Sequence, residues 1–100
     1  MESLQFSDHA KRRMRERKIA KLVVELVVWK ATYRYIDSAT RYTVFVKRIL
    51  FRGKDRYIAV SAEHREEGWI VVSVHPIQDR DLLSRVISGR WYEKKDKRTL

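Results

Sequence analysis

Cysteine is absent from the sequence, and glycine and proline are scarce, with three glycines and one proline in 100 residues. The lack of cysteine excludes disulfides and thiolate metal sites. Because no glycine- or proline-rich linker divides the chain, we predict a single domain over residues 1–90, followed by a basic tail over residues 91–100.

No apolar run reaches the ~20 residues that span a bilayer, and the first ten residues lack the apolar core of a secretion signal. We therefore predict a cytoplasmic protein.

Positive charge is the feature that the sequence has in excess. Lysine and arginine number 23 against 13 acidic residues, which gives a formal net charge of +10. Net charge does not specify a fold, but it restricts the partners that a protein attracts. RNA, DNA, an anionic membrane surface and an acidic protein are all compatible with this charge. Of these we expect RNA or an acidic protein, and no membrane.

Two helices are predicted at the amino-terminal end. Ser7 followed by Asp8 is typical of a helix start, because a serine oxygen accepts hydrogen bonds from free backbone amides and an acid is stabilised near the positive end of the helix dipole. Ala10 and Met14 share a narrow apolar face, so we expect both to be buried. The basic side chains around them are expected to stay exposed: Lys11, Arg12, Arg13 and Arg15. A second apolar helix over residues 19–29 would complete a helical hairpin.

Alternating apolar and polar residues begin near Tyr33 and continue in four segments, "TYRYI", "RYTVFVKRILF", "RYIAVSAEH" and "WIVVSVH". Turn-forming residues separate these segments at 37–40, 52–55 and 65–68, and such short connections favour antiparallel neighbours. An apolar stripe over residues 77–89 predicts a third helix that Gly89 ends. The predicted fold is α+β, with an amino-terminal helical hairpin packed on a four-stranded antiparallel sheet and a carboxy-terminal helix.

The first helix is also the place where chemistry is most strongly indicated. His9 and Arg13 stand four residues apart, so their side chains are neighbours on a helix. Arginine offers a planar fork that matches a phosphate group. The simpler interpretation is that this basic face is merely solvated.

Two further constellations have both a functional and a structural interpretation. The segment "AEHREEG" at 62–68 gathers acids around one histidine, but a solvated hairpin tip explains it better than a metal site. We therefore predict no metal and no cofactor. Tyrosines and arginines alternate along the predicted sheet, where they would form either a stacking surface for unpaired bases or the outer face of the sheet.

The opening segment also matches a motif, F-S-x-H-A-x-x-R-M-x-x-R-x-I. The matching residues are Phe6, Ser7, His9, Ala10, Arg13, Met14, Arg17 and Ile19. Together with the later strand "IVVSVHP", which contains Ser73, this motif resembles a family of small bacterial and archaeal proteins of unknown function that is grouped with the RelE/ParE-like toxins. The resemblance covers roughly residues 6–77. It implies a compact domain similar to that group, RNA cleavage without a metal ion, and an acidic antitoxin protein as partner.

Cleavage of RNA through its ribose 2′-hydroxyl needs a base, an acid and positive charge at the phosphate. The candidates for catalysis are His9, Arg13, Ser73 and His75, and the candidates for nucleic-acid binding are Arg12, Arg17, Arg41 and Arg48. We predict that His9 and Arg13 border a groove whose other wall includes Ser73 or His75. A surface histidine before a turn proline is the simpler interpretation of His75.

Two alternatives to a ribonuclease stay open. One is a non-catalytic module that binds RNA or an acidic partner. The other is a gyrase-directed toxin without nuclease activity, since the ParE branch of the resembling group acts on DNA gyrase. The sequence also leaves open whether the chain forms a homodimer.

Overall fold

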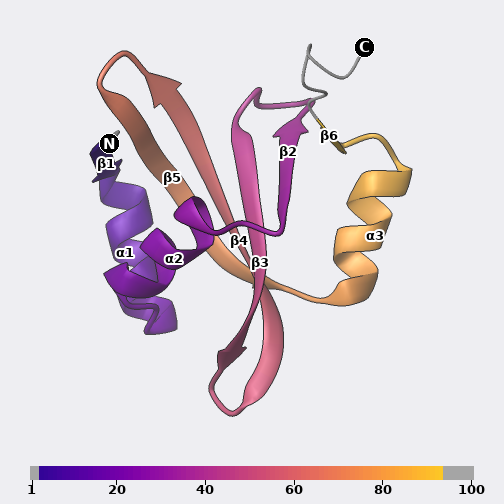
Figure 1. Ribbon diagram of the computed structural model, residues 1–100, viewed down its shortest axis with the longest axis horizontal. Coiled ribbons are helices and arrows are strands. Elements are labelled where there is room, and N and C mark those ends of the chain that lie inside the picture. Colours follow the sequence, from indigo (N-terminus) through magenta and orange to yellow (C-terminus); the bar gives the residue numbers. More distant parts are fainter. Residues whose placement is uncertain (1–2, 94–100) are drawn as a thin grey trace.

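The computed structural model describes residues 3–93, and within that range the chain forms three helices and one six-stranded mixed sheet. The fold is therefore α+β, as predicted (Figure 1). The helices are α1 (Asp8–Arg17), α2 (Lys21–Trp29) and α3 (Asp79–Ile87). The strands are β1 (Ser3–Phe6), β2 (Tyr33–Asp37), β3 (Thr43–Phe51), β4 (Lys54–Arg65), β5 (Gly68–Ile77) and β6 (Trp91–Glu93).

The sheet order is β1-β5-β4-β3-β2-β6. Strands β2 to β5 form the antiparallel meander that the alternating pattern predicts. The prediction of four strands is nevertheless wrong, because β1 joins β5 in parallel and β6 joins β2 antiparallel. β1 has four residues and β6 has three, and segments this short carry too little alternation to be recognised.

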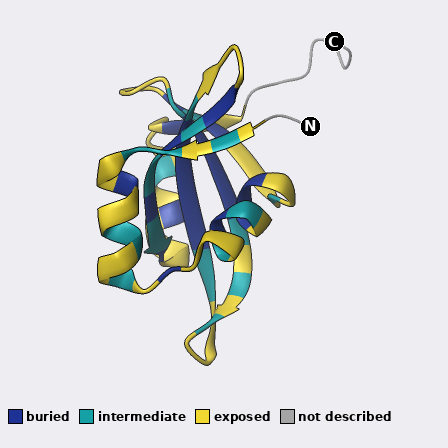
Figure 2. Cartoon of the chain, turned by 90° about the vertical axis from the view of Figure 1, so that its left-hand side faces the viewer, coloured by how far each residue is buried: buried dark blue, intermediate teal, exposed yellow. Residues whose placement is uncertain are grey.

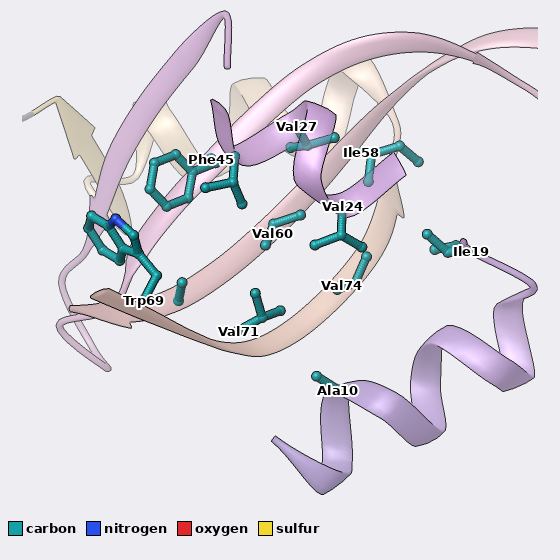
Figure 3. Packing of buried hydrophobic residues seen from close by; sticks show 12 residues of the cluster. Ala10, Ile19, Val24, Val27, Phe45, Ile58, Val60, Trp69, Val71 and Val74 are labelled. Atoms are coloured by element: carbon teal, nitrogen blue, oxygen red, sulfur yellow. The ribbon is translucent and has the colours of Figure 1, made fainter. Parts of the chain in front are cut away.

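The predicted helical hairpin also differs from the structure in detail. α1 packs against β5, whereas α2 packs against β3 and β4. Each helix thus buries its apolar face on the sheet, with Ala10 contributed by α1 and Val24 and Val27 by α2 (Figure 3). Lys18 ends α1 in the left-handed conformation, with φ of 54°. This residue turns the chain before α2 begins.

The start of α1 is the one that the sequence indicates. The Ser7 hydroxyl oxygen accepts a hydrogen bond from the amide of Ala10 at 3.1 Å, and Ala10 is completely buried. Lys11, Arg12 and Arg15 are exposed, as expected. The expectations for Met14 and Arg13 hold only in part, because both residues are half-buried.

Both faces of the sheet are covered by apolar side chains, and the central strands are largely buried (Figure 2). Below α1 and α2 lie Phe45, Ile58, Val60, Val71 and Val74. On the opposite face lie Tyr35, Val44, Val46, Ala59, Ile77, Leu82 and Trp91. Because Leu82 belongs to α3, this helix packs on the second face.

The predicted basic tail does not begin at residue 91. Trp91 is 1% exposed and lies in β6, so the folded part of the chain extends beyond residue 90. Residues 94–100, the remainder of the predicted tail, lie outside the described residues. Within the described part of the chain, no helix has the length and apolar character needed to cross a bilayer.

Gly68 is required where β1 joins the sheet. It pairs with Ser3, has φ of 144°, and leaves no space for a Cβ atom, which would overlap the backbone of Ser3. Gly53 has a positive φ of 75° but open space around it. We expect Gly68→Ala to lower the free energy of unfolding by about 1–3 kcal/mol through backbone strain alone, with a further loss from the displacement of β1.

Gly53→Ala is the matched control, because it introduces strain without a clash. Denaturation in urea should show a clearly larger loss for Gly68→Ala than for Gly53→Ala. Equal losses in the two variants would mean that the pairing of β1 with β5 contributes nothing to stability.

Candidate functional site

A groove of about 490 Å³ opens on the sheet face that carries α3. His9 from α1, Ser73 and His75 from β5, and Arg85 from α3 line it, and Arg90 contributes from the segment before β6. Segments far apart in the sequence therefore meet at one surface. This convergence makes the groove the candidate site.

The sheet explains how α1 reaches a groove on that face. β1 pairs only with Gly68–Val71, so the rest of β5 has no neighbouring strand on that edge. α1 runs along this edge, and the guanidinium of Arg17 donates a hydrogen bond to the carbonyl of Val74. At the other end of the helix, the amide of Ser7 donates to the carbonyl of Val71 at 2.9 Å, so the first turn of α1, which carries His9, begins beside the middle of β5.

A β-bulge directs the polar residues of β5. Ser61 pairs with Ser73 while Ala62 pairs with Val71, so Val72 is an extra residue in the strand. Beyond the bulge Val74 points into the core below α1 and α2, and Ser73 and His75 point toward the groove. Bulges commonly redirect side chains in this way next to functional sites.

Three of the four residues predicted for catalysis line this groove, namely His9, Ser73 and His75. As predicted, one wall comes from the first helix and the other from the last long strand. Arg13 is not a lining residue, and its guanidinium instead pairs with Glu16 at 3.1 Å. The spacing of His9 and Arg13 places them side by side on the helix but does not say which of them faces the groove.

The four arginines predicted to bind nucleic acid have different partners in the structure. Arg12 is exposed and donates to His9 Nδ1 at 3.3 Å, whereas Arg17 holds α1 to β5. Arg41 donates to the Tyr92 hydroxyl at 3.4 Å, and Arg48 lies 3.6 Å from Asp79. Of these four interactions, the one made by Arg12 reaches a predicted catalytic side chain, and the charge of Arg17 also acts on His75.

His75 is the most perturbed titratable group of the groove. Burial, reinforced by the charges of Arg85 and Arg17, lowers the pKa of His75 from 6.5 to about 4. Its Nε2 atom is buried and has no hydrogen-bond partner among the described residues. At neutral pH the ring is therefore uncharged, and an uncharged imidazole has one nitrogen that can accept a proton.

His9 presents the complementary chemistry. Arginine has only hydrogen-bond donors, so the contact from Arg12 requires Nδ1 of His9 to be an acceptor. In the neutral ring the proton must then lie on Nε2. In this state His9, a residue of the groove, carries an N–H donor at Nε2.

Asp37 lines the groove and holds neighbouring groove residues in place through hydrogen bonds. Its buried carboxylate accepts hydrogen bonds from Arg90 Nε at 2.8 Å, Trp91 Nε1 at 3.2 Å and the amides of Ala39 and Thr40. Burial by itself raises the pKa of Asp37, but these hydrogen bonds outweigh burial and hold the pKa below its ordinary value. The carboxylate stays ionised, anchors β6 to β2 and positions Arg90 at the groove.

The sequence analysis did not identify Arg85, Arg90 or Asp37 as site residues. Arg85 follows the buried Leu82 by three residues, so the helical spacing could have placed it on the inner side of α3. No local pattern connects Asp37 with Arg90, because they meet only through the pairing of β2 with β6.

The described part of the chain contains no group of three or more histidine, cysteine, aspartate or glutamate side chains arranged to hold a metal ion. In the segment considered for such a site, Glu63 instead pairs with Arg65 at 3.2 Å. These two residues lie at the end of β4, next to the turn into β5.

Comparison of the chain with protein-family models, with curated proteins and with solved structures gives no significant match. The relation to the RelE/ParE-like toxins therefore stays a prediction from the motif. Any conclusion about function depends on the groove itself.

Proposed function

We propose that this chain is a toxin-type endoribonuclease that cleaves RNA in the cytoplasm without a metal ion. The observation that carries the proposal is the meeting of His9 and His75 in one groove with Arg85 and Arg90. Two imidazoles and two guanidinium groups can supply what phosphodiester cleavage by a ribose hydroxyl needs: a base, an acid and positive charge.

In the proposed reaction, the uncharged ring of His75 accepts the proton of the 2′-hydroxyl as the 2′-oxygen attacks the adjacent phosphorus. The bond from phosphorus to the 5′-oxygen breaks as His9 passes its Nε2 proton to that leaving oxygen. His9 enters this step as an imidazolium ion, with Nδ1 released from Arg12, and leaves it as a neutral ring. Arg85 and Arg90 balance the charge on the phosphate, and the Ser73 hydroxyl donates a hydrogen bond to it. The products are a 2′,3′-cyclic phosphate and a 5′-hydroxyl.

The assignment to a RelE/ParE-like group is part of the same proposal. It is supported by the motif residues from Phe6 to Ile19, and by the antiparallel meander of β2 to β5 with helices on both faces. An acidic antitoxin protein would complement the net charge of +10. A homodimer stays a prediction from the sequence.

A non-catalytic RNA-binding module is the second candidate. It is favoured by the exposed basic face of α1, where Lys11 and Arg15 do not line the groove. A protein that only binds RNA through phosphate contacts would need such a surface and no histidine.

The test is incubation of the purified chain with single-stranded RNA in EDTA and, in parallel, in magnesium. We expect equal cleavage in both, with fragments that end in a 2′,3′-cyclic phosphate and a 5′-hydroxyl. If the RNA stays intact in both conditions, the ribonuclease proposal is contradicted and the non-catalytic RNA-binding module is the better account. Cleavage in magnesium alone would contradict the metal-independent route.

A further inference from the structure

A row of aromatic rings crosses the sheet on the same face as the groove. Neighbouring ring centroids are 5.9 Å apart for Tyr35 and Trp91, 6.0 Å for Tyr33 and Tyr35, and 6.2 Å for Tyr33 and Tyr57. The row has a guanidinium at each end, with Arg85 4.8 Å from the Trp91 ring and Arg48 5.3 Å from the Tyr57 ring.

The two halves of this row have different surroundings. Tyr35 and Trp91 are 5% and 1% exposed, and they belong to the core. Tyr33 is 36% exposed and Tyr57 is half-buried, so part of each ring is accessible to a ligand. The open half therefore consists of two tyrosines and the guanidinium of Arg48.

The strand register places this open half close to the groove. Tyr57 pairs with Ile77, which is two residues from His75 on β5. Tyr33 lies in the same cross-strand row as His75, through Val46 and Ala59. With a spacing of about 4.8 Å between strands, Tyr33 and His75 are ~14 Å apart along the sheet.

We propose that Tyr33, Tyr57 and Arg48 form a stacking subsite for an unpaired RNA base next to the phosphate in the groove. The subsite rests on the proposed function, because it makes single-stranded RNA the substrate class. Aromatic rings bind unpaired bases of any sequence through their faces, and a neighbouring arginine adds a cation–π contact and an attraction to the phosphate. An acidic peptide would satisfy the charge but would leave the rings without a stacking partner.

The subsite is tested by fluorescence anisotropy with a short single-stranded RNA whose 2′-hydroxyls are methylated, so that binding is measured without cleavage. Tyr33→Leu and Tyr57→Leu should each weaken binding roughly tenfold, the scale of one base–aromatic stack. Tyr57→Phe keeps the ring and should bind like the wild type. Tyr92→Leu is the matched control, because Tyr92 is 41% exposed, does not line the groove and lies next to Trp91 in β6, where side chains alternate between the two faces.

The same RNA in duplex form should bind much more weakly than the single strand, because its bases are already stacked. The subsite is overturned if the leucine variants bind like the wild type, or if the duplex binds as tightly as the single strand. Failure of the subsite can be distinguished from failure of the proposed function. If binding depends on the rings but unmodified RNA is not cleaved, only the assignment as a ribonuclease is contradicted. If RNA is cleaved and neither leucine substitution changes the cleavage, only the subsite is contradicted.

Discussion

Replacement of His9 by alanine is expected to slow RNA cleavage by ~10²–10⁴-fold, the usual contribution of a general acid or base. The reason is that His9 lines the groove and supplies the Nε2 proton that the leaving oxygen takes up in the proposed reaction. Without this N–H group, the leaving oxygen has no donor from α1. The rate is measured on single-stranded RNA in EDTA at saturating substrate, so that the loss reports turnover and not binding.

Two variants provide controls for this experiment. His64→Ala removes a histidine that does not line the groove, and it should cut RNA like the wild type. Arg13→Ala removes the neighbouring motif residue, which also lies outside the groove, so its loss should be smaller than that of His9→Ala. If His9→Ala cut as fast as the wild type, or if Arg13→Ala were the more damaged variant, His9 would not be the acid.

The second large effect is expected in the pH dependence of stability. His75 has a pKa of about 4 in the folded chain, below its ordinary value of 6.5. Between these values the unfolded chain binds a proton that the folded chain does not, so stability falls as the pH falls. From pH 7 to about pH 4.5, this single group should lower the free energy of unfolding by about 2–3 kcal/mol.

Urea denaturation of the wild type and of His75→Gln at the two pH values measures this contribution. The loss on acidification should be smaller in His75→Gln by roughly the stated amount. Asp37 does not confuse the comparison, because its lowered pKa costs stability only below its ordinary value of 3.8. An equal loss in the two proteins would show that His75 is not held neutral by its surroundings.

Local patterns predicted most of the fold. The alternation from Tyr33 onward predicted β2 to β5, because each of these strands is long enough to show a period of two residues. The edge strands were missed because β1 and β6 are held in place by distant partners, Gly68 and Asp37, and not by their own patterns. The mixed character of the sheet follows from the parallel pairing of β1, which no local signal indicates.

The candidate site was predictable to a similar degree. His9 was identified from the motif, and Ser73 and His75 from their place on the last long strand. The bulge at Val72 was not predicted, although it determines that Ser73 and His75 face the groove. Arg85 and Arg90 were missed because their positions depend on how α3 packs on the sheet and how β6 pairs with β2.

The most direct test of the groove uses the three histidines of the chain as internal reporters. Their imidazole signals can be followed by NMR while single-stranded RNA with methylated 2′-hydroxyls is added to the full-length chain at neutral pH. We predict that the signals of His9 and His75 shift together in a saturable manner, and that His64, which does not line the groove, keeps its position. A shift of His64 alone, or no shift of His9 and His75 at saturation, would contradict the assignment of this groove as the RNA site.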